Sequence, residues 1–253
     1  MPDPRLFLDH DLGAGLQIAL DEAQGRYLTQ VLRMHAGAHA RVFNGRDGEW
    51  STTLARADKR GVLLTVGDQL RAQAPVPDVT LLFSPLKRQA TDWLIEKATE
   101  LGVRTLRPVL CKRTVAETVR LDRLNSIARE AAEQTERLDV PEIAEAESLA
   151  RALDGWPADR PLIYADEAGD DQSKPWGGQA GRGGPLSDAL VGLKAQSLAV
   201  LIGPEGGFDV TERSMLRGLP FVIPVSLGPR ILRAETAAVA TLAVIQARWG
   251  DWR

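Results

Sequence analysis

The chain has 253 residues, of which 44% are hydrophobic and 26% charged, a composition typical of a globular protein with a substantial core. Its formal net charge of −3 excludes a general positive field, so any binding to nucleic acid would depend on local basic patches. The sequence has no apolar run long enough for a membrane span, and its single cysteine excludes an internal disulfide and favours a reducing cytoplasm.

Residues 1–72 have the pattern of a small β-rich domain. Strands are expected at 40–44, 49–55 and 61–66, where Val, Thr, Phe and Trp are frequent and turn sequences separate the segments. One helix is expected over residues 22–34, because Tyr27, Val31 and Met34 would then share a face.

The pattern changes after a short segment, residues 73–78, which contains two prolines and no apolar periodicity and which we interpret as a linker. Residues 79–253 alternate between strand and helix patterns, and this alternation indicates an α/β domain with a largely parallel sheet. Strands are expected at 79–84, 104–110, 161–166, 197–203 and 220–228, and helices at 92–102, 121–137, 186–194, 210–218 and 233–249.

Three details of this domain give further expectations. Asp209 and Glu212 have the spacing of a capping box at the start of a helix. The helix over 233–249 is apolar almost all round, so we expect it to be covered by its own sheet or by a second subunit. Residues 168–186 are rich in glycine and polar residues, which predicts a flexible insertion with no part in the fold.

Two loops near the C-terminus follow apolar strands and carry the residues of greatest chemical interest. The first, Gly203–Phe208, has three glycines, which allow close approach of a ligand or simply a tight turn. In the second, Leu227–Thr236, Arg233 and Glu235 open a helix, where a carboxylate can equally well complement the helix dipole.

Together the two loops predict one pocket. Ligands bind outside the carboxyl ends of strands in open α/β sheets, so the loops would form adjacent walls. A pocket lined by backbone groups with few charges suits an adenine and a ribose. It does not suit a triphosphate, because GPEGGF lacks the Lys-Ser/Thr pair of a phosphate-binding loop.

The same loops resemble a known family. LIGPEGGF (201–208) and LGPRILRAETA (227–237) are similar to the paired signatures of RsmE-type 16S rRNA uracil-N3 methyltransferases. IEKATELGV (95–103), REAAEQTERLDVPEI (129–143) and the N-terminal QVLRMHAG (30–37) also resemble that family, whereas residues 166–190 do not. Tyr27 departs from the family pattern, in which many members have a histidine.

The resemblance implies a PUA-like RNA-binding β-barrel over 1–72 and a SPOUT domain with a deep trefoil knot over 79–253. It further implies a cytoplasmic homodimer that binds S-adenosyl-L-methionine (SAM), needs no metal, and acts on 16S rRNA of the small ribosomal subunit. Carried over by position, the cofactor-binding residues are Gly203, Glu205, Gly206, Gly207, Leu227, Gly228, Ile231, Leu232 and Thr236.

Methylation of uracil N3 requires a group that stabilises the base as N3 loses its proton. Arg233 is the first candidate for this role, and Glu235 and Glu205 are candidates for orienting Arg233 or for accepting the proton. All three residues could instead have a purely structural role in the loops.

Candidate contacts to RNA phosphates are Arg5, Arg33, Arg113 and Arg137, each of which could also be an ordinary solvated surface charge. Two other functions remain open at this point. One is methylation of a ribose 2′-hydroxyl by a SPOUT enzyme, and the other is a non-catalytic RNA-binding role in ribosome assembly.

Overall fold

A computed structural model describes residues 3–115, 118–171 and 173–253, and these form two compact units. The N-terminal unit contains the residues up to Pro75 together with Ala132–Val140, and the second unit contains Val76–Ala131 and Pro141–Arg253. The division after Pro75 lies inside the segment 73–78 that the sequence predicts as a linker. The sequence gives no sign, however, that residues 132–140 pack with the N-terminal unit.

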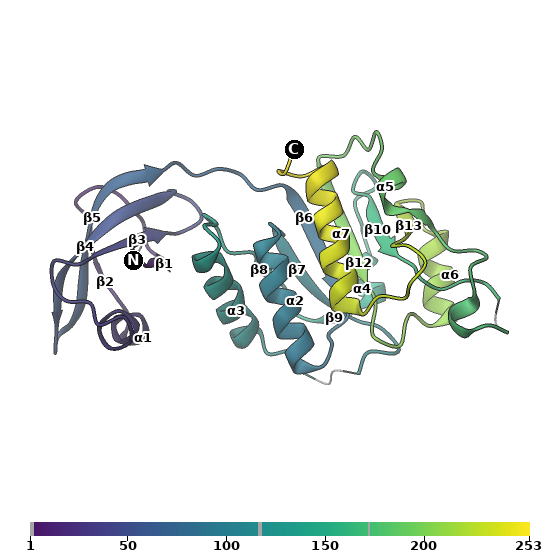
Figure 1. Ribbon diagram of the computed structural model, residues 1–253, viewed down its shortest axis with the longest axis horizontal. Coiled ribbons are helices and arrows are strands. Elements are labelled where there is room, and N and C mark those ends of the chain that lie inside the picture. The colour runs from purple at the N-terminus through teal and green to yellow at the C-terminus, as the bar shows by residue number, and fades with distance from the viewer. Residues whose placement is uncertain (1–2, 116–117, 172) are drawn as a thin grey trace. The chain divides into compact units, whose positions relative to one another are not determined.

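The N-terminal unit is built on a five-stranded sheet with the strand order β1-β3-β4-β5-β2 (Figure 1). The strands are β1 (Arg5–Phe7), β2 (Gln17–Ala19), β3 (His39–Phe43), β4 (Glu49–Asp58) and β5 (Gly61–Arg71). β1 is parallel to β3, and the other pairs are antiparallel. The helix expected over 22–34 is shorter, because α1 (Glu22–Arg26) passes into a π-helical turn, η1 (Tyr27–Val31).

Buried apolar residues at alternate positions along the strands form the core of this unit. In β5, Val62, Leu64 and Val66 are almost fully buried, and the residues between them are partly exposed. This is the period of two that a half-buried strand requires.

A buried ion pair lies beside this core. The side chain of Arg5 donates from Nε to Glu49 Oε1 at 2.5 Å, and both side chains are almost completely buried. Arg71 also donates to Glu49, at 2.8 Å. The remaining donors of Arg5 bind the main-chain oxygens of Ala132, Glu133 and Arg137, at 2.6–2.9 Å. Arg5 therefore attaches the segment 132–140 to the N-terminal sheet.

The pKa of Glu49 reflects this arrangement. Burial by itself would raise the pKa, but hydrogen bonds from Arg71 and Arg5 outweigh burial, and the net shift is downward. The pKa of Glu49 in the folded state lies below its value in the unfolded state. Glu49 therefore stabilises the fold at pH values above the ordinary glutamate pKa of about 4.3, and this stabilisation is lost as the pH falls through the lower folded-state pKa.

The second unit contains a parallel sheet with the order β11-β13-β10-β12-β6-β7-β8, and the short β9 (Glu147–Ser148) also pairs with β7. Every strand pair described in this sheet is parallel. The other strands are β6 (Asp78–Phe83), β7 (Thr105–Leu110), β8 (Glu142–Ile143), β10 (Leu162–Ala165), β11 (Gly184–Pro185), β12 (Ser197–Ile202) and β13 (Val222–Ser226). The parallel α/β architecture expected from the sequence is confirmed.

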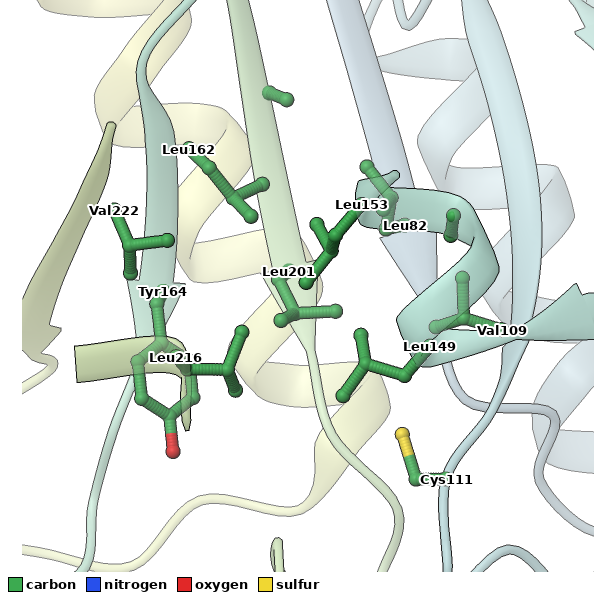
Figure 2. Packing of buried hydrophobic residues seen from close by; sticks show 12 residues of the cluster. Leu82, Val109, Cys111, Leu149, Leu153, Leu162, Tyr164, Leu201, Leu216 and Val222 are labelled. Atoms are coloured by element: carbon green, nitrogen blue, oxygen red, sulfur yellow. The ribbon is translucent and has the colours of Figure 1, made fainter. Parts of the chain in front are cut away.

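Helices flank this sheet (Figure 1). They are α2 (Arg88–Glu100), α3 (Leu121–Gln134), α4 (Leu149–Leu153), α5 (Leu186–Ala189), α6 (Val210–Gly218) and α7 (Ala234–Arg248). On one face, Leu149 and Leu153 of α4 belong to the same buried cluster as Leu82, Leu162 and Leu201 of the strands (Figure 2). The capping box predicted at Asp209 and Glu212 is confirmed at the start of α6.

α7 is buried on one face, which packs toward α2 and β12, but Val239, Ala240, Ala243 and Val244 are only partly covered. The trefoil knot that the resemblance implies stays a prediction.

The expectation that residues 168–186 have no part in the fold is wrong. Arg213 of α6 donates to the main-chain oxygen of Ala168 at 2.7 Å and to Asp170 Oδ1 at 2.7 Å. Gly169 and Trp176 are joined by a main-chain hydrogen bond of 2.8 Å. The segment then contributes β11, which pairs with β13. Gly177, Gly178 and Gly181 have positive φ, which glycine adopts without strain in tight turns.

We predict that Glu49→Gln will destabilise the full-length protein by about 3–5 kcal/mol at neutral pH, because the change leaves Arg5 buried without a full counter-charge. Chemical denaturation followed by circular dichroism measures this difference. The difference from wild type should shrink as the pH falls below the folded pKa of Glu49. Glu22→Gln, at an exposed ion pair, is the matched control and should change stability little. Equal effects of the two substitutions would contradict the prediction.

Candidate cofactor pocket and active site

Three loops meet at one edge of the parallel sheet. β10 pairs with β12 on one side and with β13 on the other, all in parallel, so the carboxyl ends of the three strands lie together. The loops that leave β12 and β13 are the two glycine-containing loops identified from the sequence. The loop that leaves β10 lies between them.

These loops surround a cavity of about 400 Å³, within the usual range for small-molecule sites. Ala165, Ile202, Leu232 and Ala237 provide apolar surface. The charged side chains at the cavity are Lys87, Glu167, Glu205 and Arg233. A second, much smaller cavity of about 20 Å³ adjoins the Leu227–Gly228 turn.

The structure brings most of the predicted cofactor-binding residues to these cavities. Gly203, Glu205, Ile231 and Leu232 line the larger cavity, whereas Leu227, Gly228 and Leu232 line the smaller one. Gly206, Gly207 and Thr236 are not among the lining residues of either cavity.

The structure shows why two positions of the first loop, 203 and 207, need glycine. A Cβ at Gly203 would lie 2.4 Å from the ring of Phe208, so this glycine allows the loop to fold back on itself. Gly207 has φ of +68°, and a Cβ there would lie 3.1 Å from the Trp176 ring and 3.7 Å from Glu167 Oε1. Gly207 therefore lets the segment after β10 approach the GPEGGF loop.

The candidate catalytic residues differ in their position relative to the larger cavity. Arg233 occupies the N-cap position of α7, is exposed and lines the larger cavity together with Glu205. Within the described residues, Arg233 forms no ion pair, and its orientation by Glu205 or Glu235 stays a prediction. Glu235 does not line the cavity, and its Oε2 is buried without a hydrogen-bond partner in the described part of the chain.

Among the charged and aromatic residues that line the larger cavity, sequence reasoning missed Lys87, Glu167 and Trp176. Glu167 comes directly after the strand expected at 161–166, so its position at the end of a buried strand could have identified it. No such signal identified Lys87, which is at the N-cap of α2, or Trp176, which lies inside the glycine-rich segment.

The pKa of the Glu167 carboxyl group is shifted upward. Burial raises the pKa of Glu167, and the neighbouring charge of Asp166 adds to the increase. Arg182 and Arg213 act in the opposite direction but do not cancel it.

The four predicted RNA-contacting arginines also differ in their surroundings. Arg5 is buried and its donors are engaged by Glu49 and main-chain oxygens, so we no longer propose it as a phosphate contact. Arg137 is largely buried and pairs with Asp139 at 2.9 Å. Arg33 is exposed, and Arg113 is exposed and donates to the main-chain oxygen of Gly206 at 3.0 Å.

The pocket matches the chemistry of SAM. Most of its lining residues are apolar, Gly203 brings the main chain close to the cavity, and a few charged side chains also line it. In residues 3–115, 118–171 and 173–253, no group of three or more His, Cys, Asp or Glu residues could hold a metal ion. Over the same ranges, the helices are all too short or too polar to span a bilayer.

Comparisons with known proteins agree with this description. Residues 72–246 match the RNA methyltransferase domain family, and residues 20–67 match the RNA methyltransferase PUA domain family. The chain is 27% identical to ribosomal RNA small subunit methyltransferase E of Rickettsia conorii, over 96% of this chain and 94% of that protein. It is 32% identical to the protein of the same name from Synechocystis, over 91% of this chain and 73% of that protein.

Solved structures give the same result. The crystal structure of ribosomal RNA small subunit methyltransferase E from Neisseria gonorrhoeae, bound to SAM, superposes with a TM-score of 0.85 at 27% identity, covering 99% of this chain and all of that one. A putative methyltransferase from Legionella pneumophila in complex with SAM has a TM-score of 0.82 at 26% identity, with 99% of this chain covered. The matched RNA methyltransferase domain spans most of the chain, and the matched PUA domain precedes it. Because relatives that match over most of their length share one name, the chain belongs to the ribosomal RNA small subunit methyltransferase E family.

Proposed function

We propose that this protein is a SAM-dependent methyltransferase of ribosomal RNA that methylates N3 of a uridine in 16S rRNA. The observation that carries the proposal is the cavity at the carboxyl ends of β10, β12 and β13, where Glu205 and Arg233 lie together beside apolar and glycine-rich walls. The family supports the assignment of ribosomal RNA as the substrate. A ribosomal substrate in turn fits a cytoplasmic protein.

Within this function the cofactor supplies an activated methyl group on a sulfonium. The backbone at Gly203, Leu227 and Gly228 and the side chains of Ile231 and Leu232 would hold it. Because these contacts are apolar or from the main chain, the charged side chains of the cavity remain for the substrate base.

Arg233 is suited to act on that base. Uracil N3 is a poor nucleophile until its proton leaves, and the negative charge that develops is shared by the two flanking carbonyl oxygens. A guanidinium at the cavity can donate to such an oxygen more strongly as its charge increases. Lys87 places a second positive charge at the same cavity, and the exposed Glu205 carboxylate can accept the proton.

The methylated product tests the function directly. Small-subunit RNA from a strain that lacks the gene should lose one 3-methyluridine, and the purified protein with SAM should restore it. Mass spectrometry of digested nucleosides measures both. A restored 2′-O-methylnucleoside would instead identify a ribose methyltransferase, and SAM binding without any methylation would identify a non-catalytic assembly factor.

Substitution of Arg233 tests its proposed role. We expect Arg233→Ala to lower kcat by roughly 10²–10³-fold with little change in the Kd for SAM, because the contact strengthens only as charge develops. Arg233→Lys should restore little activity, and a higher pH should partly rescue Arg233→Ala by ionising more uracil. Parallel losses of SAM affinity and thermal stability, with no rescue at high pH, would instead show that Arg233 is structural.

A homodimer is also part of the proposal. The incompletely covered apolar residues of α7, Val239, Ala240, Ala243 and Val244, support a second copy of the chain as the missing cover. Sedimentation at micromolar concentration should show a dimer, and Val244→Asp should convert it to a monomer. Val210→Asp, at an exposed helix N-terminus where a carboxylate is tolerated, is the control. A wild-type monomer that binds SAM would contradict the dimer.

A further inference from the structure

A further cavity, of about 350 Å³, lies at the same edge of the parallel sheet as the cofactor pocket. It is formed by the segment between β6 and α2 and by the segment between β7 and α3. Because β6 is parallel to β12 on one side and to β7 on the other, these segments leave the sheet at the edge where the glycine loops lie. We call it the basic cavity, after Lys87, Arg88, Arg120 and Arg123, which line it.

The charge of the basic cavity is opposite to that of the chain. Besides its four basic side chains, Asp92 is the one acidic residue among the described lining residues. Asp92 accepts from Arg123 Nε at 2.9 Å, so these two charges neutralise each other. The positive charge of Lys87, Arg88 and Arg120 remains. The whole chain has a formal net charge of −3, and the basic cavity is therefore a local positive patch of the kind that nucleic-acid binding by this chain requires.

Three of these cations are available to a ligand. Lys87 and Arg88 are exposed and form no ion pair in the part of the chain that the structure describes. Arg120 pairs with Asp122 at 2.8 Å, but both side chains are largely exposed, and such a surface pair contributes little and opens readily. The first turn of α2 adds no acidic side chain that would compete for them.

The basic cavity adjoins the cofactor pocket at Lys87. Among the described residues, Lys87 is the one that lines both cavities. The loops that border them are also in contact, since Arg113, which follows β7, donates to the main-chain oxygen of Gly206 at 3.0 Å. A polynucleotide with one base in the larger cavity can therefore continue past Lys87 with its backbone in the basic cavity.

We propose that the basic cavity binds phosphate groups of the RNA strand next to the target uridine, an inference that rests on the proposed function. A guanidinium donates to two oxygens of one phosphate, and Arg88 and Arg120 supply two such groups. Contacts to phosphate fix the register of a strand without reading its sequence, so they determine which base reaches Arg233. Arg88 and Arg120 thereby have the role expected from the sequence for Arg5, whose donors are engaged within the fold.

The salt dependence of RNA binding by the full-length protein tests these contacts. The probe is small-subunit RNA from a strain that lacks the gene, bound in filter assays to wild type, Arg88→Gln, Arg120→Gln and the double variant at several KCl concentrations. Each substitution should raise the Kd for RNA by roughly 3- to 10-fold. It should also reduce the slope of log affinity against log salt by about 0.7, the value for one lost phosphate contact of a single strand. The KM for RNA should rise in parallel, with kcat and the Kd for SAM unchanged.

Two further variants serve as controls. Arg104→Gln changes an exposed arginine that directly precedes β7, at the opposite edge of the sheet, and should bind RNA as wild type does. Arg88→Lys keeps the charge and should retain the slope of wild type. Melting temperatures identify a variant that fails to fold, and Arg88→Lys and Arg120→Gln then carry the test.

The possible outcomes are distinct. Arg88→Gln and Arg120→Gln variants that bind RNA as Arg104→Gln does would overturn the phosphate contacts, and so would a loss of affinity without a change of slope. A raised Kd for SAM with unchanged RNA affinity would also overturn them and indicate that the cavity holds the carboxylate of the cofactor. Wild type that neither binds nor methylates this RNA would instead refute the proposed function itself.

Discussion

Parallel alignment of β12, β10 and β13 is the constraint on which the site depends. Parallel neighbours end at the same edge of the sheet, so residues separated by long stretches of sequence become the walls of one cavity. The β12 loop contributes Glu205, the β13 loop contributes Arg233, and β10 places Glu167 between them. A shift of one strand by a single residue would reverse the faces of its side chains and disrupt these walls.

The buried charge of Asp166 fixes the wall that is formed by the segment after β10. A carboxylate that is 2% exposed requires strong partners, and Arg213 and Arg217 provide them from one face of α6. The same arginines bind main-chain oxygens at Ala168 and Gly181, so the glycine-rich segment is held at both ends by one helix. Charge and hydrogen bonding connect the described residues of this segment to α6.

This explains which features could be predicted from the sequence. Strands such as β6 and β12 and the capping box at Asp209 are encoded by neighbouring residues, and local pattern was sufficient to find them. The contacts of residues 168–186 with α6 depend on arginines 32–45 positions further along the chain, which no local pattern reveals. Arg5 is a similar case, because a surface arginine and a buried one look identical until Glu49 and the carbonyls near residue 133 are placed beside it. At the site, the glycine loops were evident, whereas Lys87 and Trp176 depend on tertiary placement.

The attachment of residues 132–140 to the N-terminal sheet has a consequence for synthesis of the protein. The donors of Arg5 need carbonyl groups as distant as that of Arg137, 132 residues later in the chain. A nascent chain that has exposed only its first 75 residues can pair its strands, but part of its buried arginine lacks partners. The N-terminal unit therefore completes its native hydrogen bonding only after more than half of the polypeptide has left the ribosome, and the folding of the two units overlaps in time.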